Sequence, residues 1–229
     1  MSGATALVLG ATGLTGSLVL RELLDDAYWE KVTVLARRGP ALNAESPDRL
    51  DVRLCELDAM RDHADVFGVD AVFCCLGTTR ARAGSAEAFR RVDHDYCIEA
   101  GRLARGQGAG HFLLVSAVNA KAESPLLYPR TKGETERALE ALDFPALTIA
   151  RPSLLHGPRN ESRYLESLGL GAMKLATPLF RRMRSKWMPV EASVVARALV
   201  QAAREDSPPR VRRLWYRELH ELAEQTGKQ

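Results

Sequence analysis

Tyr128 and Lys132 form the pair of residues with the clearest chemical potential. In the segment Tyr128-Pro129-Arg130-Thr131-Lys132 they are four residues apart, and on a helix this spacing places both on one face. A nearby ammonium stabilises a phenolate and lowers the tyrosine pKa from its usual value of about 10. Tyr128 could then exchange a proton with a substrate oxygen near neutral pH. The alternative is a surface tyrosine beside a solvated lysine.

Ser116 is the third candidate catalytic residue. It ends the apolar run 111–116, where a strand would reach the catalytic edge of a sheet. Its hydroxyl could hold a substrate oxygen beside Tyr128, while a nicotinamide cofactor carries the hydride. The sequence therefore predicts carbonyl reduction or alcohol oxidation, with Ser116, Tyr128 and Lys132 as the catalytic set.

The cofactor is indicated by a glycine-rich turn near the N-terminus. The apolar run 7–9 is followed by glycines at spacings of three, and then by a segment with helical periodicity. A strand, tight turn and helix in this order place the N–H groups of a helix N-terminus against a pyrophosphate. In a plain strand–helix turn the glycines would serve packing alone. The predicted cradle residues are Gly10, Thr12, Gly13, Leu14, Thr15 and Gly16.

Residues after the later strands should complete the cofactor site. Arg37 and Arg38 follow the second strand, where a basic side chain binds a 2′-phosphate and an acidic one a 2′-hydroxyl, so we expect NADP(H) rather than NAD(H). Two solvated arginines are the alternative. Asp58, after the third strand, is expected to reach the adenine amino group. The segment after the fourth strand should pass beneath the ribose; it comprises Leu76, Gly77 and Thr78.

Strand-like apolar runs alternate with helical patterns along the chain. This alternation predicts an α/β fold, with a doubly wound parallel sheet in a single domain over residues 1–229. A small C-terminal substrate lobe is expected from insertions at about 156–190. The expected strands are 6–9, 31–36, 52–57, 71–76, 111–116 and 146–150, and the expected helices 16–24, 86–105, 131–142, 192–204 and 215–226.

Composition excludes several classes of protein. A net charge of +3 is too small to indicate nucleic-acid binding, and no apolar run approaches the length of a membrane span. The sequence shows no signal-peptide pattern, so a cytoplasmic location is expected. No metal site or disulfide is expected, because the cysteines form no CxxC pair and are predicted to be small buried residues; they are Cys55, Cys74, Cys75 and Cys97.

These motifs together resemble the short-chain dehydrogenase/reductase superfamily, in its atypical or extended branch. Within it, the stretches 74–80, 92–96 and 132–134 are similar to those of the group that contains the Tat-interacting protein TIP30, or CC3. The resemblance implies a Rossmann core that binds NADP(H), with Lys132 on the nicotinamide ribose and with Pro152 and Ser153 beside the nicotinamide. Members often carry an asparagine in a proton-relay chain, but the segment 92–95 has none.

Several questions stay open at the level of sequence. The substrate is a small molecule of unknown identity, and a protein partner or a homo-oligomer is compatible with the sequence. His111 is expected on the surface, whereas His156 could line the substrate pocket. The basic segment 181–187, which includes Arg181 and Lys186, could be a solvated helix end or could touch a partner or a membrane surface. A dinucleotide-binding regulatory or scaffold protein with little turnover is the second hypothesis.

Overall fold

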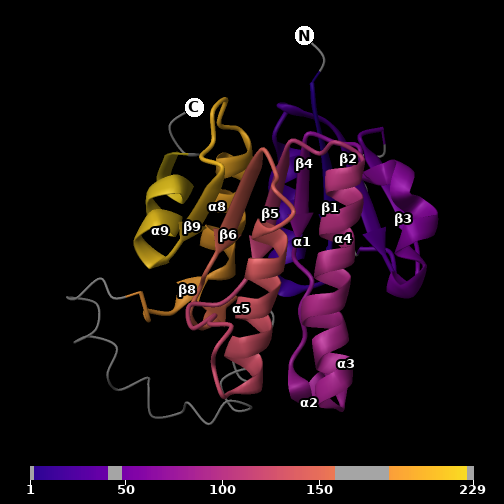
Figure 1. Cartoon of the computed structure of the whole chain (residues 1–229). Coiled ribbons are helices and arrows are strands. Elements are labelled where there is room, and N and C mark those ends of the chain that lie inside the picture. Colours follow the sequence, from indigo (N-terminus) through magenta and orange to yellow (C-terminus); the bar gives the residue numbers. More distant parts are fainter. Residues whose placement is uncertain (1–2, 41–47, 158–185, 226–229) are drawn as a thin grey trace.

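A seven-stranded, fully parallel sheet forms the centre of the molecule (Figure 1). The computed structural model describes residues 3–40, 48–157 and 186–225. The strand order is β3-β2-β1-β4-β5-β6-β9, so the predicted fold class is confirmed. The strands are β1 (Ala4–Leu9), β2 (Trp29–Ala36), β3 (Leu50–Leu54), β4 (Ala71–Cys74), β5 (His111–Val115), β6 (Ala146–Ala150) and β9 (Val211–Leu214).

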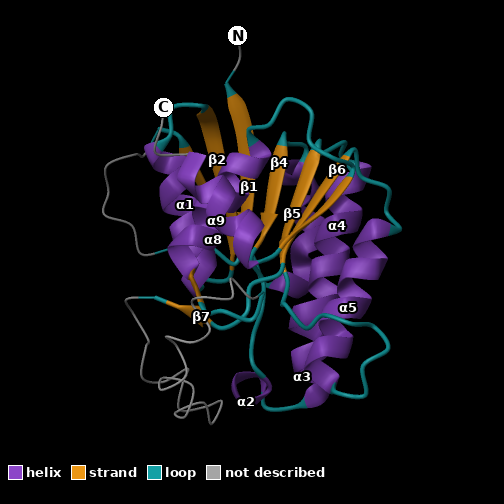
Figure 2. Cartoon of the chain, turned by 90° about the vertical axis from the view of Figure 1, so that its left-hand side faces the viewer, coloured by secondary structure: helices purple, strands orange, loops and turns teal. Residues whose placement is uncertain are grey.

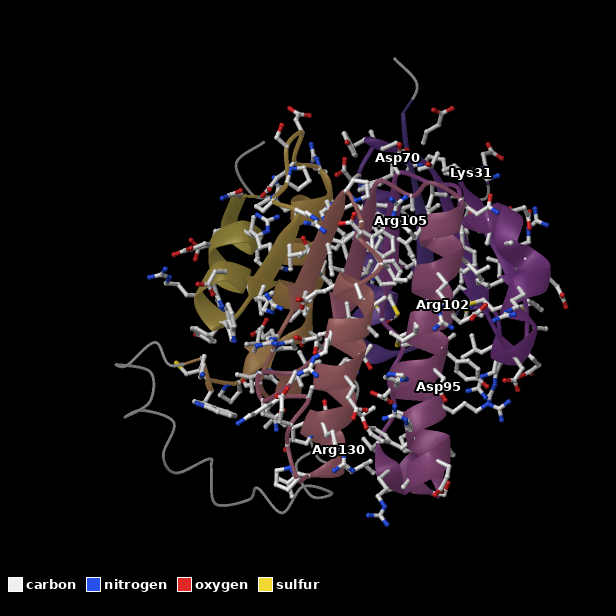
Figure 3. The ribbon with its side chains drawn as sticks, in the orientation of Figure 1. Lys31, Asp70, Asp95, Arg102, Arg105 and Arg130 are labelled. Carbon is white, nitrogen blue, oxygen red and sulfur yellow. The ribbon has the colours of Figure 1, made fainter. Side chains whose placement is uncertain are left out.

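Helices cover both faces of the sheet (Figure 2). Successive side chains of a strand point to opposite faces, and β1 supplies both cores: Ala6 and Val8 pack in one, Leu7 and Leu9 in the other. The first face is covered by α1 (Leu14–Asp25), α8 (Ala192–Ala203) and α9 (Tyr216–Gln225). The second is covered by η1 (Leu57–Phe67), α4 (Tyr96–Gly106) and α5 (Leu127–Glu140). The exposed side of α4 carries Arg102 and Arg105 (Figure 3).

The strand order reverses between β1 and β4, which lie side by side at the middle of the sheet. In open parallel sheets, ligands bind outside the carboxyl ends of the strands at such a switch point. These ends form the lower edge of the sheet in Figure 1. The chain beyond β4 descends past this edge into the short helices α2 (Arg80–Ala83) and α3 (Ala86–Arg90).

Several predicted elements have different bounds in the structure, most clearly three of them. The helix expected at 86–105 is present, but a π-helical segment, η2 (Arg91–Asp95), separates α3 from α4. The helix expected at 131–142 begins earlier, at Leu127, because Pro129 falls in the first turn, where its missing N–H leaves no hydrogen bond unmade. The third strand, expected at 52–57, ends at Leu54, because Leu57 already begins η1.

The C-terminal region contains strands that the sequence did not reveal. β9 reads Val-Arg-Arg-Leu, which is too short and too charged to resemble a buried strand, yet it pairs with β6 at the edge of the sheet. A second, two-stranded parallel sheet joins β7 (Leu155–His156) to β8 (Val190–Glu191). Most of the expected substrate lobe at 156–190 lies outside the described residues.

The expectation that His111 lies on the surface is wrong. Its side chain is buried in the first position of β5, and its Nε2 is 2.9 Å from the Thr148 hydroxyl on β6. Burial, with a smaller contribution from the positive charge of Arg212, lowers the pKa of His111 to about 4. His111 therefore belongs to the interior between two central strands and takes no part in the site.

Candidate dinucleotide and catalytic site

The glycine turn has the geometry that a phosphate cradle requires. Gly10 has φ +79°, a left-handed conformation that side chains rarely adopt, and the Gly13 N–H donates to its carbonyl oxygen at 2.9 Å. Helix α1 begins at Leu14 with Gly13 as its N-cap, and no side chain caps the first turn. Its first N–H groups are therefore available to an anion.

Gly16 allows the first turn of α1 to pack directly against the backbone of Gly10. A Cβ on Gly16 would overlap the carbonyl oxygen of Gly10 and lie 2.7 Å from its carbonyl carbon. These are backbone atoms that cannot move aside without reshaping the turn. Thr12 and Gly13 are exposed, whereas Thr15 is buried, so the outer part of the turn is the part open to a ligand.

At the adenosine end, the predicted residues are exposed. Arg37 and Arg38 both lie on the surface directly after β2. Asp58 accepts hydrogen bonds of 2.5 Å from Arg91 and 2.7 Å from the Tyr96 hydroxyl. The Tyr96 hydrogen bond is the main reason that the pKa of Asp58 is lowered. The carboxylate therefore already has partners at the place where an adenine amino group is expected.

The loop after β4 is tied to a buried acid. The Thr78 N–H donates to Asp93 Oδ2 at 2.8 Å, and a Cβ on Gly77 would lie 3.5 Å from Asp93 Oδ1 and 3.7 Å from Lys132 Nζ. Leu76 is buried and Gly77 is exposed. This loop therefore passes directly over the buried charges, as a segment beneath a ribose would.

Lys132 is buried and ion-paired, whereas Tyr128 is exposed. Lys132 Nζ lies 2.8 Å from Asp93 Oδ1 and 3.5 Å from the Val115 carbonyl oxygen. Burial alone would favour the neutral amine, but the neighbouring acidic groups, Asp93 first and then Tyr128 and Cys97, raise the pKa of Lys132 above its usual range. Tyr128 is 42% exposed, and its ring centroid is 5.9 Å from that of Phe89. The two predicted residues thus share one face of α5 at its opening turns.

Ser116 lies deeper than its predicted role requires. Its hydroxyl donates to Glu136 Oε1, and Glu136 also accepts a 3.0 Å hydrogen bond from Arg151 Nε. Glu136 is eight residues beyond Tyr128 on α5, which corresponds to about 12 Å along the helix axis. In this structure the Ser116 hydroxyl therefore points to a buried carboxylate two turns away from the phenol, and its substrate-orienting role stays a prediction.

The segment after β6 runs beside the loop after β5. The Val118 N–H donates to the carbonyl oxygen of Pro152 at 2.8 Å, and the Ser153 hydroxyl donates to the carbonyl oxygen of Met188. His156 is half-buried in β7. Pro152 and Ser153 thus lie at the carboxyl edge of the sheet, and their place beside a nicotinamide stays a prediction.

Two acids in the site were given no role by the sequence reasoning. Asp93 lies within the segment 92–95 that lacks an asparagine, and Glu136 belongs to no motif described above. A signal for Glu136 was present, since it continues the spacing of four that links Tyr128 to Lys132. Nothing local marks Asp93, because its partner lies in a helix far along the chain. The basic segment 181–187 lies outside the described residues except for Lys186 and Trp187.

The fold and the glycine turn define a dinucleotide-binding protein of the Rossmann type. Comparison with known families agrees, since the family model described as NAD(P)H-binding matches residues 10–171. The chain belongs to this family. Protein HTATIP2 of Rattus norvegicus is 38% identical over 164 residues, which cover 71% of this chain and 67% of that protein. The predicted resemblance to the TIP30 group is therefore confirmed.

Fungal relatives match nearly the whole chain. Protein FMP52-1, mitochondrial, of Scheffersomyces stipitis is 34% identical over 225 residues, which cover 95% of this chain and 98% of that protein. The protein named fmp52, mitochondrial, of Aspergillus fumigatus is 33% identical over 220 residues, covering 93% and 94%. These names contradict the cytoplasmic location expected from the sequence, so that prediction is wrong.

Solved structures support the fold. MoeE5 in complex with UDP-glucose and NAD has a TM-score of 0.68 at 18% identity, covering 97% of this chain and 82% of its own. WbmH of Bordetella bronchiseptica in complex with NAD⁺ has a TM-score of 0.69 at 15% identity, covering 96% and 80%. At such identities the likeness shows the Rossmann architecture alone.

Two kinds of feature are absent from the described residues. No helix among them is both long and apolar enough to cross a membrane. The same part of the chain contains no cluster of three or more histidine, cysteine or acidic side chains with the geometry of a metal site. All four cysteines are free thiols.

Proposed function

We propose that the protein is an NADP(H)-dependent oxidoreductase of short-chain dehydrogenase/reductase type, acting on a carbonyl or an alcohol. The observation that carries the proposal is the placement of Tyr128 and Lys132 on the opening turns of α5. Lys132 there contacts both Asp93 and the end of β5, beside the loop that follows β4. Family membership supplies the dinucleotide.

The residues present fit a pyrophosphate and a nicotinamide ribose. The uncapped start of α1 and the turn closed by Gly16 leave room and N–H donors for phosphate. A bound nicotinamide would supply or accept the hydride. Tyr128 is the proton donor or acceptor for the substrate oxygen, and the Lys132 ammonium stabilises its phenolate and binds the ribose hydroxyls.

Ser116 can orient a substrate only if its hydroxyl leaves Glu136. Its hydroxyl donates to Glu136 in this structure, so rotation about the Cα–Cβ bond is needed before it can donate to a substrate oxygen. Such a rotation removes one hydrogen bond from a buried carboxylate that keeps Arg151 as a partner. We therefore propose that Ser116 orients the substrate oxygen after this rotation.

The test of the reaction is Tyr128→Phe, which removes the proton donor and keeps the ring that contacts Phe89. We expect turnover to fall by at least about 100-fold, in line with the loss of general acid–base catalysis, while the dissociation constant for NADPH stays within about twofold. Tyr28→Phe is the matched control, because Tyr28 is equally exposed, at 41%, and lies elsewhere in the fold. Full activity in Tyr128→Phe would refute the mechanism.

The preference for NADP(H) over NAD(H) rests on Arg37 and Arg38. Both are exposed after β2, where they can reach a 2′-phosphate. Arg37→Ala should weaken NADPH binding by about tenfold, the effect of one charge-assisted contact, and leave NADH binding unchanged. Titration of both dinucleotides by fluorescence measures this, with Arg102→Ala, on the outer side of α4, as the control. An unchanged ratio of the two affinities contradicts the assignment.

A dinucleotide-binding regulatory protein is the second candidate. The observation that favours it is the engagement of the Ser116 hydroxyl by Glu136, which takes one member of the catalytic set away from a substrate. Oxidation of NADPH in the presence of aldehydes, ketones and quinones separates the two candidates. Turnover that depends on Tyr128 supports the enzyme, and absence of turnover together with a cofactor-dependent protein partner supports the regulator.

A further inference from the structure

Asp93 is a buried acid in an irregular part of a helix. It belongs to η2, the π-helical segment between α3 and α4, and only 1% of its surface is exposed. π-Helical turns are rare and occur often at functional sites, because the extra residue reorients the side chains of the turn. A carboxylate is seldom buried to this degree unless it is paired.

Each polar part of Asp93 meets a different element of the site. Oδ1 pairs with Lys132 Nζ at 2.8 Å, and Oδ2 accepts the Thr78 N–H at 2.8 Å. The main-chain carbonyl oxygen accepts a 2.9 Å hydrogen bond from the Thr135 hydroxyl on α5. One residue therefore joins the loop after β4 to the helix that carries Lys132 and Tyr128.

These contacts restrict where the Lys132 ammonium can lie. An ammonium has three N–H donors, and here Nζ forms an ion pair with Asp93 Oδ1 at 2.8 Å and donates one hydrogen bond, to the Val115 carbonyl oxygen at 3.5 Å. Donor capacity on Nζ is therefore left for a ligand. Without Asp93, the flexible four-carbon stem of lysine has no anionic anchor in the described part of the site.

Asp93 also balances the charge near Tyr128. The groups that face Lys132 are Asp93 from η2, Tyr128 from its own helix and Cys97 from α4. The contact with the Cys74 thiol, together with burial, raises the pKa of Cys97 well above its usual range, so that thiol is neutral. The local charge is therefore that of a Lys⁺–Asp⁻ pair, which stabilises a Tyr128 phenolate less than a lone ammonium does.

We propose that Asp93 is a positioning residue, which anchors the Lys132 ammonium beneath the loop after β4 and sets the acidity of Tyr128 by partly cancelling the lysine charge. The inference rests on the proposed function for its purpose, but its geometry is independent of turnover. It assigns a role to the segment 92–95, in which the asparagine of the expected proton relay is missing: a carboxylate contacts the lysine directly.

The test uses Asp93→Asn, which keeps the size of the side chain and an oxygen for the Thr78 N–H but removes the charge. Asp95→Asn is the matched control: Asp95 lies in the same turn, its side chain is 55% exposed and labelled in Figure 3, and its partner is His94. Two measurements are made on the protein without substrate. One is the rate of amine labelling of Lys132 by mass spectrometry, and the other is the ionisation midpoint of Tyr128 from ultraviolet difference spectra against Tyr128→Phe.

In Asp93→Asn, we expect Lys132 to be labelled at least about tenfold faster, which corresponds to a pKa lower by about one unit. The Tyr128 midpoint should fall by about half a unit or more. Asp95→Asn should change neither. Unchanged labelling and an unchanged midpoint in a folded Asp93→Asn protein overturn the inference, even if the enzyme turns over. The expected shifts in a protein without turnover support the inference and refute the proposed reaction instead.

If Asp93→Asn does not fold, the wild-type protein provides the second measurement. Nitrogen-15 spectra of the lysine Nζ groups, recorded as a function of pH, give the titration of Lys132 and of the exposed Lys31. Titration of Lys132 above Lys31 supports the anchored ion pair. Titration at or below Lys31 overturns it, because an unanchored buried lysine loses its proton more easily.

Discussion

The strongest prediction about stability concerns Glu136, at the centre of a buried network between α5 and the ends of β5 and β6. Its side chain is 2% exposed, and it accepts hydrogen bonds from Ser116 and from Arg151, whose side chain is 17% exposed. Glu136→Gln keeps the shape of the side chain and removes its charge. The Arg151 guanidinium then lacks its carboxylate in an environment that water reaches poorly.

The size of the effect follows from the burial. Removal of one partner of a buried ion pair costs about 3–5 kcal/mol, and the remaining amide oxygen can still accept one hydrogen bond, so we take about 3 kcal/mol. For a chain of this length, each kcal/mol lowers Tm by about 2–4 °C. Glu136→Gln should therefore melt about 6–12 °C below the wild-type protein.

Thermal unfolding followed by circular dichroism at neutral pH measures the shift, and urea titration gives the free energy independently. Glu123→Gln is the control. Glu123 precedes α5 and pairs with Arg137, which lies on α5 like Glu136, but both side chains of this pair are more than 60% exposed. Pairs of that kind contribute about 0–1 kcal/mol, so its Tm should change by no more than about 4 °C. Equal shifts for the two variants would refute the reasoning, because burial would then have made no difference.

The glycine turn and the buried His111 can each be tested by one substitution. Gly16→Ala should abolish dinucleotide binding, because the added Cβ overlaps the Gly10 carbonyl oxygen. Gly106→Ala is the control and should bind normally, because the space around its Cβ is open. Calorimetric titration with NADPH measures both, and normal binding by Gly16→Ala would contradict the close approach of Gly16 to Gly10. The His111 pKa is about 4 in the folded protein and about 6.5 when unfolded, so the unfolded state binds more protons in between. His111 should therefore add about 2–3 kcal/mol of stability above pH 6.5, lost as pH falls towards 4. Urea titrations at both pH values should show a smaller loss for His111→Gln, and equal losses would disprove it.

The sequence predicted the parts of this structure that have local causes. Alternation of apolar strands and amphipathic helices is a local pattern, and it predicted every strand of the sheet but the last. The glycine turn was predicted because Gly10 needs a left-handed backbone and Gly16 a close approach, and glycine alone satisfies both. Neither requirement depends on distant residues.

The parts that could not be predicted depend on contacts between distant segments. His111 follows a run of small, polar residues that is typical of a surface turn, and only the pairing of β5 with β6 buries it against Thr148. Asp93, the partner of Lys132, lies 39 positions earlier in the chain. The Ser116 hydroxyl donates to Glu136, which lies on α5. β9 was missed because an edge strand needs no apolar pattern.

The division of the interior into two separate cores has a consequence for synthesis of the chain. Among the described residues, one core is formed by residues that precede 150, but the other needs α8 and α9, which begin at Ala192 and Tyr216. While the chain emerges from the ribosome, the sheet face that carries Ala6, Val8 and Val34 therefore stays only partly covered until the C-terminal helices are made. An exposed apolar face of this kind is a natural binding site for chaperones, and a truncated chain that ends before α8 would aggregate through it.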